Sequence, residues 1–414
     1  MTSIITSYEY YDYRAPNSAN LNDDNGDFSI TIHNEDLITH PHSSLLELRG
    51  KITGTMPGIP AVGDQDEVPP TQMASLDLAK ITLAPGGWLH LFDRIDYYIG
   101  ENKIDTVRKP GITCLMKGLA SFENDRKYCD AGWNYSLKEP ENTMKTSGWF
   151  TVTIPLRIVM GFFEDHKSYV YHMIQKLVFY RTAKGFNNMF RLAPAYLGAT
   201  FDLDLKDVIL KMPHVKFDLD HATKVRSEIT TGSKYDLYFR KWSYNYIIPP
   251  QGTDFTWDIP VTYSKVKYLL IVFQTNRVDN RAEDGGQFDL CDLENCQVVL
   301  NNNVYYPHER MNMRVTEHRC APLYTMFKRF KSSYYTLVED LADPLLSYTE
   351  FLTKNPMIVI DCSNQPDILK TELINMKIFF NWRSPLPANT VVHCVTIVDD
   401  KAVYQPRDNI VTHT

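Results

Sequence analysis

Two similar hairpin-like segments lie roughly half the chain apart, and this repeat constrains the fold more than any other feature of the sequence. In the first, residues 94–99 lead through Gly100 and Asn102 into 103–105. In the second, residues 296–300 lead through three asparagines into 304–306. Glycine and asparagine suit the tight turn of a β-hairpin. A repeat this long exceeds the period of solenoids and propellers, so the sequence predicts two consecutive domains of one architecture.

Short strand-like runs separated by Gly, Pro or Asn indicate that this architecture is an all-β sandwich. The 25 Tyr and 20 Phe support this interpretation, because aromatic and β-branched side chains suit a pleated, half-buried surface. In the run 149–158, Phe150, Val152 and Ile154 alternate with Thr151 and Thr153, which predicts one buried face. The expected strands are 45–52, 76–83, 88–99, 149–158, 170–181 and 208–217.

Other segments complete the expected organisation. The run 391–398 is apolar on both faces, which predicts a strand that is covered on both sides or lies at an interface. Helical patterns are sparse, at 165–176 and at 333–351, the latter interrupted by Pro344. We divide the chain into an N-terminal arm (1–27), a first sandwich (28–218) and a second sandwich with a C-terminal tail (219–414). The Tyr-rich stretch 8–13 is either a clasp on another surface or a disordered tail.

Charge and cysteine content limit the possible partners. The net charge of −7 is atypical of a protein that coats phosphate backbones, so we expect no strong sequence-specific nucleic-acid binding. The strongest basic patch, which is either a nucleic-acid contact or a solvated face, is Lys328, Arg329 and Lys331, with Phe327, Phe330 and Tyr334 beside it. Seven scattered cysteines and an N-terminus without signal-peptide features predict reduced thiols and synthesis inside a cell. No apolar run reaches the length of a transmembrane helix.

No strong catalytic or cofactor motif occurs in the sequence, so we expect a non-enzymatic protein with no catalytic, cofactor-binding or metal-binding residues. Three weaker patterns resemble metal sites. One is a group of thiols and imidazoles whose spacing fits no usual zinc site: Cys291, Cys296, His308, His318 and Cys320. Another is two pairs of carboxylates, Asp202 with Asp204 and Asp218 with Asp220, which are better explained as strand side chains that face solvent. The last resembles a calcium loop in composition but is better explained as a turn: Asp23, Asp24, Asn25, Gly26 and Asp27. The glycosylation sequon at Asn134 is expected to be idle.

Three stretches resemble the double jelly-roll capsid-like proteins encoded by Polinton-type and adintovirus-like elements. They carry packing and turn signatures rather than reactive groups, and they touch both halves of the chain. The first is 91–99 with its return 103–105 and Pro110-Gly111-Ile112; the second is 150–156 running into Gly161-Phe162-Phe163-Glu164-Asp165; the third is 359–365 together with Pro387-Ala388-Asn389-Thr390.

The resemblance implies two tandem jelly-roll β-sandwiches with few short helices. It further implies a major capsid protein that forms pseudo-hexagonal homotrimers in an icosahedral shell. Such a protein would reside in the virion capsid, contact neighbouring capsomers and possible minor capsid or vertex proteins, and carry no catalytic residues. The alternative is a non-enzymatic tandem β-sandwich that binds a glycan or receptor, with Trp133, Tyr135 and Trp242 as stacking residues.

The alternation in 149–158 generates the first testable prediction. Ile154→Asp should abolish soluble expression, because an unpaired carboxylate in the core costs several kcal/mol out of a domain stability of ~5–15 kcal/mol. Thr153→Asp should be tolerated, because Thr153 lies on the opposite face of the strand. The soluble yield of the two variants measures this difference. Equal yields would show that the strand or its register is misassigned.

Overall fold

The fold is described from a computed structural model of the whole chain. The structure describes residues 4–16, 21–33, 38–56, 71–72, 81–122, 125–133, 147–183, 186–192, 194, 197–260, 265–301, 304–307, 309–317, 319–338, 343–364 and 373–413.

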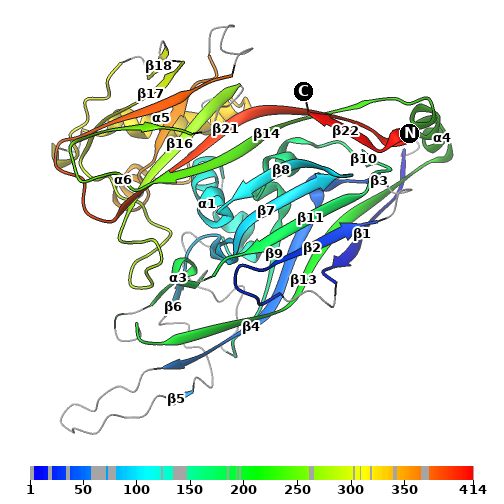
Figure 1. Cartoon of the computed structure of the whole chain (residues 1–414), viewed down its shortest axis with the longest axis horizontal. Coiled ribbons are helices and arrows are strands. Elements are labelled where there is room, and N and C mark those ends of the chain that lie inside the picture. The colour runs from blue at the N-terminus through cyan, green and yellow to red at the C-terminus, as the bar shows by residue number, and fades with distance from the viewer. Residues whose placement is uncertain are drawn as a thin grey trace.

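The first half of the chain forms two antiparallel sheets around a hydrophobic core (Figure 1). One sheet has the strand order β1-β13-β4-β9 and the other β2-β11-β7-β8. These strands are β1 (Ile5–Arg14), β2 (Asp27–Ile32), β4 (Leu45–Met56), β7 (Phe92–Ile99), β8 (Asn102–Arg108), β9 (Trp149–Pro155), β11 (Gln175–Arg181) and β13 (Thr200–Phe217). Shorter strands extend the first sheet or pair separately: β3 (Ile38–Thr39), β5 (Thr71–Gln72), β6 (Ile81–Leu83), β10 (Val170–Tyr171) and β12 (Phe190–Leu192).

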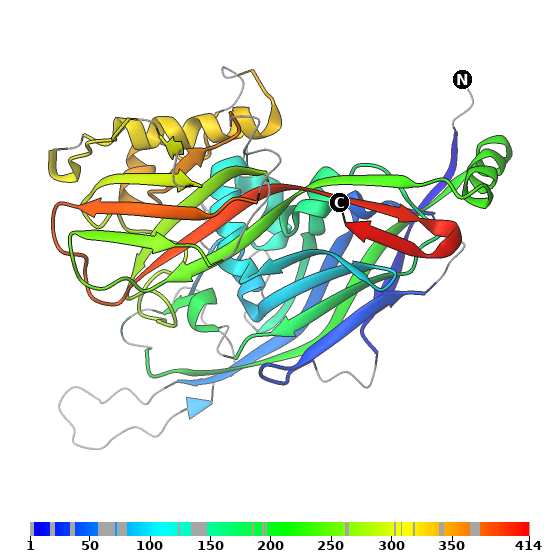
Figure 2. The same ribbon diagram turned by 45° about the horizontal axis from the view of Figure 1, so that its top comes forward.

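The second half forms two further antiparallel sheets with the orders β14-β21-β16-β19 and β15-β20-β17-β18. Their strands are β14 (Tyr235–Ile247), β15 (Asp254–Asp258), β16 (Val266–Thr275), β17 (Leu293–Leu300), β18 (Val304–Tyr306), β19 (Ile358–Asp361), β20 (Met376–Trp382) and β21 (Thr390–Gln405). A final strand, β22 (Ile410–His413), pairs with the end of β21. Figures 1 and 2 show that β14 and β21 extend beyond their own sandwich and run alongside the first one.

Both halves have the same topology. When the eight main strands of each half are numbered in chain order, strands one, eight, three and six form one sheet. Strands two, seven, four and five form the other sheet. This arrangement of eight antiparallel strands in two facing sheets is the jelly roll. The all-β, double jelly-roll fold expected from the sequence is therefore confirmed.

The local expectations that define the repeat are also confirmed. Strand β7 pairs with β8, and β17 pairs with β18, each as an antiparallel hairpin at the same edge of its sheet. In β9, Phe150, Val152 and Ile154 are buried, while Thr151 is exposed and Thr153 is half-buried. The strand ends at Pro155, and residues 156–158 continue as a 3₁₀ turn.

Six α-helices connect the strands in the part of the chain that the structure describes. Helices α1 (Pro110–Ser121) and α5 (Ala321–Tyr335) occupy the same position in the two jelly rolls, between the fifth and sixth strands. The others are α2 (Gly161–Asp165), α3 (Phe186–Met189), α4 (Leu219–Thr230) and α6 (Tyr348–Lys354). Helix α4 links the two jelly rolls, and Asp218 caps it by accepting a hydrogen bond from the backbone N–H of His221 at 2.8 Å.

Several element assignments from sequence were wrong. Residues 165–176 are not a helix, because α2 ends at Asp165 and the following aromatic and β-branched residues form β10 and the start of β11. The helix expected over 333–351 is two helices, α5 and α6, with Pro344 between them. In the expected strand 88–99, the first residues form a 3₁₀ turn, η3 (Gly87–Leu91), that buries Trp88. Most of the expected strand 76–83 lies outside the described residues.

The Tyr-rich stretch 8–13 lies on its own chain. It forms most of β1, which pairs with β13 and holds the position in the first jelly roll that β14 holds in the second. Most β1 side chains remain exposed. Residues of the expected N-terminal arm thus contribute the first strand of the first jelly roll. The proposed division at residues 218 and 219 stays an expectation, and it falls where β13 ends and α4 begins.

Candidate functional site

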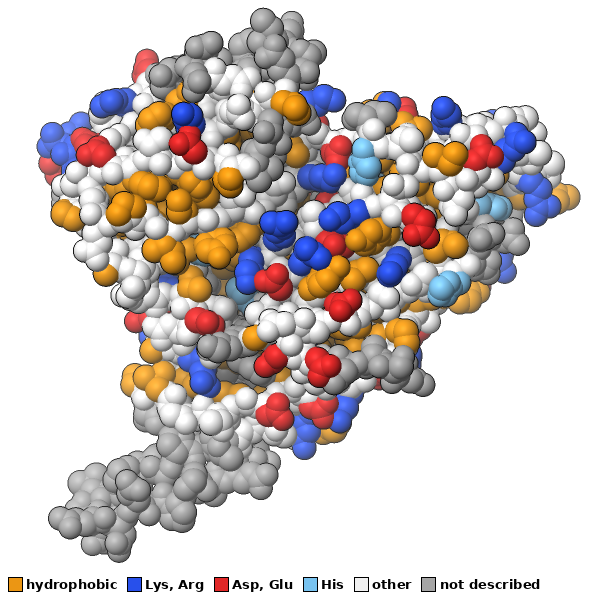
Figure 3. Space-filling model, in the orientation of Figure 1, with side chains coloured by type: hydrophobic (Ala, Val, Ile, Leu, Met, Phe, Trp, Pro, Cys, Tyr) orange, Lys and Arg blue, Asp and Glu red, His pale blue; other side chains and the backbone are white. Residues whose placement is uncertain are grey.

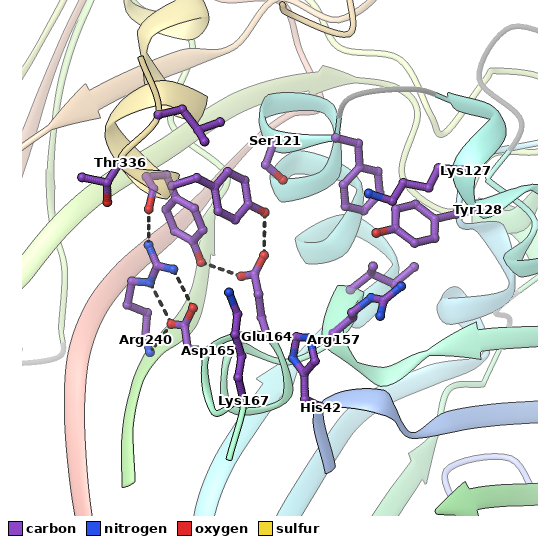
Figure 4. A pocket seen from close by; sticks show the side chains of 15 residues that line it. His42, Ser121, Lys127, Tyr128, Arg157, Glu164, Asp165, Lys167, Arg240 and Thr336 are labelled. Atoms are coloured by element: carbon purple, nitrogen blue, oxygen red, sulfur yellow. Dashed lines mark hydrogen bonds and ion pairs between the residues drawn. The ribbon is translucent and has the colours of Figure 1, made fainter. Parts of the chain in front are cut away.

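The two jelly rolls meet through α1, α2 and β8 on one side and β14, β16 and α5 on the other. We call this contact the junction. Its central residues, several of which are drawn in Figure 4, are Lys117, Gly161, Glu164, Asp165, Arg240, Trp242, Tyr334 and Tyr335.

A bidentate ion pair ties α2 to β14. The backbone N–H and Nε of Arg240 both donate to Asp165 Oδ2, at 2.9 and 2.8 Å, and Nη2 donates to Oδ1. Arg240 Nη1 also donates to the backbone oxygen of Tyr334 at 2.7 Å, and its guanidinium lies 3.5 Å from the centre of that ring. One side chain therefore fixes three elements from the two jelly rolls with directional, charge-assisted bonds.

A second charged pair lies deeper in the junction. The ammonium of Lys117, on α1, is 1% exposed and bonds to the carboxylate of Glu164 and to the hydroxyl of Tyr335. Tyr335 and Tyr334 donate to Glu164 at 2.6 and 2.7 Å, and Trp242 lies 4.9 Å from the ammonium. Burial alone would lower the pKa of Lys117, but Glu164 and Tyr335 raise it above its usual value. Lys117 therefore stays charged inside the protein.

Gly161 allows the closest backbone approach at the junction. A Cβ at this position would lie 1.6 Å from the backbone oxygen of Arg240, which is well inside any permitted contact. Next to it, the Phe162 ring packs edge-on against Phe239 of β14, with ring centres 5.4 Å apart. The glycine thus allows α2 to reach β14, and the aromatic pair fills the space beside the ion pair.

A buried carboxylate on β8 binds the backbone at the start of α2. Asp105 accepts hydrogen bonds from the backbone N–H of Phe162 at 2.9 Å and of Thr106 at 2.8 Å. Burial raises the pKa of Asp105 from 3.8 to about 6. Its ionised form is therefore destabilised in the folded protein, even though these hydrogen bonds favour it.

The other end of the junction is more apolar. There a cavity of about 210 Å³ lies between the jelly rolls, and its lining includes His90, from the first, and His393 and Tyr244, from the second. Burial lowers the pKa of His90 to about 4 and of His393 to about 3. His393 Nδ1 bonds to the Tyr244 hydroxyl at 2.7 Å. Both imidazoles are neutral at physiological pH, which avoids two like charges across the contact.

A solvent-open groove of about 620 Å³ lies over the charged end of the junction (Figure 4). Both carboxylates on its wall, Glu164 and Asp165, already accept bonds from Lys117, Arg240 and the two tyrosines. For these two carboxylates the geometry is that of a structural contact, in which each negative charge is neutralised by a fixed partner.

A family model for the double jelly roll-like domain matches residues 82–403, which span both jelly rolls. The chain belongs to the double jelly roll-like family. Among solved structures, PBCV-1 VP54 fitted into a reconstruction of the virophage Sputnik aligns with a TM-score of 0.57 at 10% identity, over 100% of this chain and 98% of that one. The mavirus major capsid protein aligns with a TM-score of 0.56 at 10% identity, over 100% of this chain and 91% of that one. The Faustovirus major capsid protein aligns with a TM-score of 0.57 at 8% identity, over 97% of this chain and 91% of that one. No curated protein matches. At these identities the structures share the fold alone.

The Cys and His residues between Cys291 and Cys320 do not form a metal site among the described residues of this double jelly roll-like chain. His308 and His318 lie outside the described residues. Cys296 and Cys320 are buried, and burial raises the pKa of the half-buried Cys291 to about 11, which disfavours the thiolate. The described ranges contain no group of three or more side chains that could hold a metal ion. All seven cysteines are present as thiols.

The carboxylate patterns have structural roles or face solvent. Asp218 caps α4, Asp204 pairs with Lys206 on the same strand, and Asp202 is exposed. The stretch 23–27 contains a turn in which the Gly26 N–H donates to the Asp23 backbone oxygen at 3.1 Å. Asn134 lies outside the described residues.

The aromatic residues expected to stack on a ligand are not available for that role. Trp133 and Trp242 are each 1% exposed, and Tyr135 lies outside the described residues. Trp133 packs between α1 and the 3₁₀ turn η3, and Trp242 packs on Lys117. The stacking role predicted for these two tryptophans is therefore wrong.

Most side chains of the basic patch, which lies on α5, are buried in the protein. Phe327, Phe330 and Tyr334 are buried, and the buried Lys331 donates to the backbone oxygen of Asp343 at 2.9 Å. Lys328 and Arg329 remain exposed. Two exposed cations on one helix do not amount to a surface that tracks a nucleic-acid backbone.

The two-faced strand 391–398 is covered within the chain. In β21, Val395 and Ile397 are fully buried beside Trp242, and Cys394 is buried on the opposite face. Both faces are thus occupied by the two jelly rolls themselves. Of the two alternatives expected for this strand, cover on both sides is the one that the structure bears out.

Sequence reasoning missed the junction residues as a group. Glu164 and Asp165 stand in the stretch 161–165, which carries part of the family resemblance. Their partners Arg240 and Tyr334 lie far along the chain. A Gly followed by two Phe and two acidic residues was a usable signal, because it combines close approach, aromatic packing and charge.

Gly161→Ala should destabilise the protein by about 3 kcal/mol or more, because overpacking costs ~1–3 kcal/mol even without a backbone collision. Gly252→Ala is the matched control, since a Cβ there meets nothing closer than 3.8 Å. It should change stability by no more than about 0.5 kcal/mol. Urea unfolding of both variants measures this. Equal midpoints for the two variants would contradict the close approach of α2 and β14.

Asp105→Asn should change the pH dependence of stability. Between pH 4 and 6 the folded protein holds a proton on Asp105 that the unfolded chain has lost, so ionisation makes wild-type stability fall as pH rises through this window. The variant has no carboxyl at position 105, so its stability does not fall with pH for this reason. The stability of the variant relative to wild type should therefore rise by about 2.4 kcal/mol from pH 4 to pH 7, since each pKa unit is worth ~1.4 kcal/mol and the unfolded carboxyl is already partly ionised at pH 4. Denaturant unfolding across this range measures the difference, and a constant difference would contradict the raised pKa.

Proposed function

We propose that this chain is the major capsid protein of a virus and assembles as a pseudo-hexagonal homotrimer into an icosahedral shell. The observation that carries the proposal is the pair of jelly rolls with identical strand order, held in one chain by a buried, charge-tied junction. Two similar units per chain let three chains surround an axis with six comparable units. Closed cyclic symmetry of this kind forms a discrete building block instead of an endless fibre.

The matched structures support this role. The mavirus and Faustovirus proteins are named as major capsid proteins, and each aligns with nearly the whole of this chain. The protein would then act structurally, without catalysis or a cofactor. It would reside in the virion capsid after synthesis inside the host cell, in contact with neighbouring capsomers and with minor capsid or vertex proteins.

The surface fits a protein that is surrounded by copies of itself. Figure 3 shows hydrophobic side chains gathered over the second jelly roll, with acidic and basic side chains interspersed across the middle of the same face. No helix in the described part of the chain is both long enough and apolar enough to cross a membrane.

Native mass spectrometry tests the proposal directly. The dominant species of the purified full chain should have three times the 47.9 kDa chain mass. Negative-stain images of the same sample should show particles with a nearly hexagonal outline. A monomer or dimer that persists at high concentration and at every salt concentration would favour the binding-protein alternative.

A further inference from the structure

The cavity of about 210 Å³ at the apolar end of the junction carries polar atoms that have no hydrogen-bond partner among the described residues. These buried atoms are His90 Nε2, Thr182 Oγ1 and His393 Nε2. His90 lies on η3 and Thr182 follows β11, both in the first jelly roll, whereas His393 lies on β21 of the second. A buried polar atom without a partner costs free energy. Three such atoms around one cavity therefore indicate that the cavity takes up a polar group.

Both imidazoles on the wall of this cavity are held in place by the protein. The His90 ring packs on Gly111 at the start of α1, where an added Cβ would lie 2.4 Å from the ring. His393 is 4% exposed, and its Nδ1 bonds to the Tyr244 hydroxyl at 2.7 Å. Its Nε2 can donate or accept, depending on whether Tyr244 or His393 donates in that bond. Groups that are fixed in advance bind a ligand at little entropic cost.

The charges around the cavity favour a neutral ligand. Lys109 is the only lysine or arginine among the described residues of the wall, and its ammonium pairs with Asp93 at 2.6 Å. Burial lowers the pKa of His90 to about 4 and of His393 to about 3, so neither imidazole is charged at neutral pH. A charged ligand would lose its hydration and meet no free countercharge. A hydroxyl, which donates and accepts, suits these neutral partners better.

The rest of the cavity suits an aromatic ring. Phe92 is buried on its wall, and the rings of Tyr244 and Tyr246, which also line it, lie 6.0 Å apart at an angle of 25°. Large hydrophobic side chains that line the cavity also reach solvent: Tyr246, Ile248 and Val278 are 59%, 64% and 45% exposed. Because these side chains belong to both the wall and the surface, they form an apolar mouth through which a ring can enter.

We propose that this cavity binds a small neutral molecule, an aromatic ring with a short chain that ends in a hydroxyl, and that the hydroxyl bonds to the polar atoms of His90, Thr182 and His393. An apolar cavity of about 150 Å³ is large enough for benzene, so the additional volume here accommodates the short chain. The ligand contacts both jelly rolls, so its binding stabilises the junction at the apolar end. The site lies within one chain and requires neither the trimer nor the shell proposed above.

The first test uses three probes with one carbon skeleton in ligand-observed NMR titrations of the purified full chain. Phenethyl alcohol should saturate one site per chain. Ethylbenzene, which lacks the hydroxyl, and phenylacetate, which carries a charge in its place, should each bind more weakly by about threefold or more, the size of one hydrogen bond. If phenethyl alcohol does not bind saturably, the polar atoms take up water only and the proposal is wrong. Equal or tighter binding of ethylbenzene or phenylacetate would overturn the chemical class.

The second test locates the site. Thr182→Val removes the hydroxyl and should weaken phenethyl alcohol binding by about threefold to tenfold without changing the affinity for ethylbenzene. Thr256→Val, at an exposed threonine on β15 away from the cavity, is the matched control and should bind both probes like wild type. Val391→Phe, on the cavity wall, fills the space and should abolish binding of both probes. Thermal unfolding shows which variants are folded, and the two threonine variants decide the matter if Val391→Phe is not. Equal affinities of Thr182→Val and Thr256→Val for phenethyl alcohol would place its binding elsewhere and overturn the proposal.

Discussion

The apolar outer face of the β14-β21-β16-β19 sheet is the constraint on which the rest of the structure depends. Leu270, Val395 and Ile397 on this sheet are fully buried. A sheet that is apolar on both faces needs cover on both, and a sandwich supplies only one. The first jelly roll contributes the missing cover, through α1, α2 and the segment around His90. Because of this shared burial, the two jelly rolls pack into one body instead of forming two independent domains joined by a linker.

Apolar burial sets how strongly the jelly rolls associate but not at what angle, because the hydrophobic effect has no direction. The charged groups supply the direction. A buried ion pair adds little net stability, but it strongly penalises any arrangement that separates the partners. Arg240 with Asp165, and Lys117 with Glu164, therefore exclude orientations that would bury the same apolar area. The angle between the jelly rolls in turn determines whether copies of the chain can close into a ring.

Features set by short-range pattern could be predicted from the sequence, and features set by long-range contact could not. The alternation around Ile154 and the two hairpins follow from side-chain period and turn residues, so they were found. The burial of 391–398 was expected, but whether its cover came from the same chain or another was not decidable locally. Residues 165–176 were mistaken for a helix because their pairing partners, β3 and β7, lie far away in the sequence. The junction was missed for the same reason.

The order of synthesis gives the buried junction a cost during translation. Ribosomes make the first jelly roll before Trp242 and Tyr335 exist, so Lys117 stays without these partners while the nascent chain lengthens by well over 100 residues. Phe162 stays without Phe239 over a shorter stretch of synthesis. During that interval the half-made protein exposes an apolar helix face to solvent. Many ribosomes making the same chain at once would bring such faces together. Formation of the junction, in addition to the stability of the finished protein, would then limit how much folded protein accumulates.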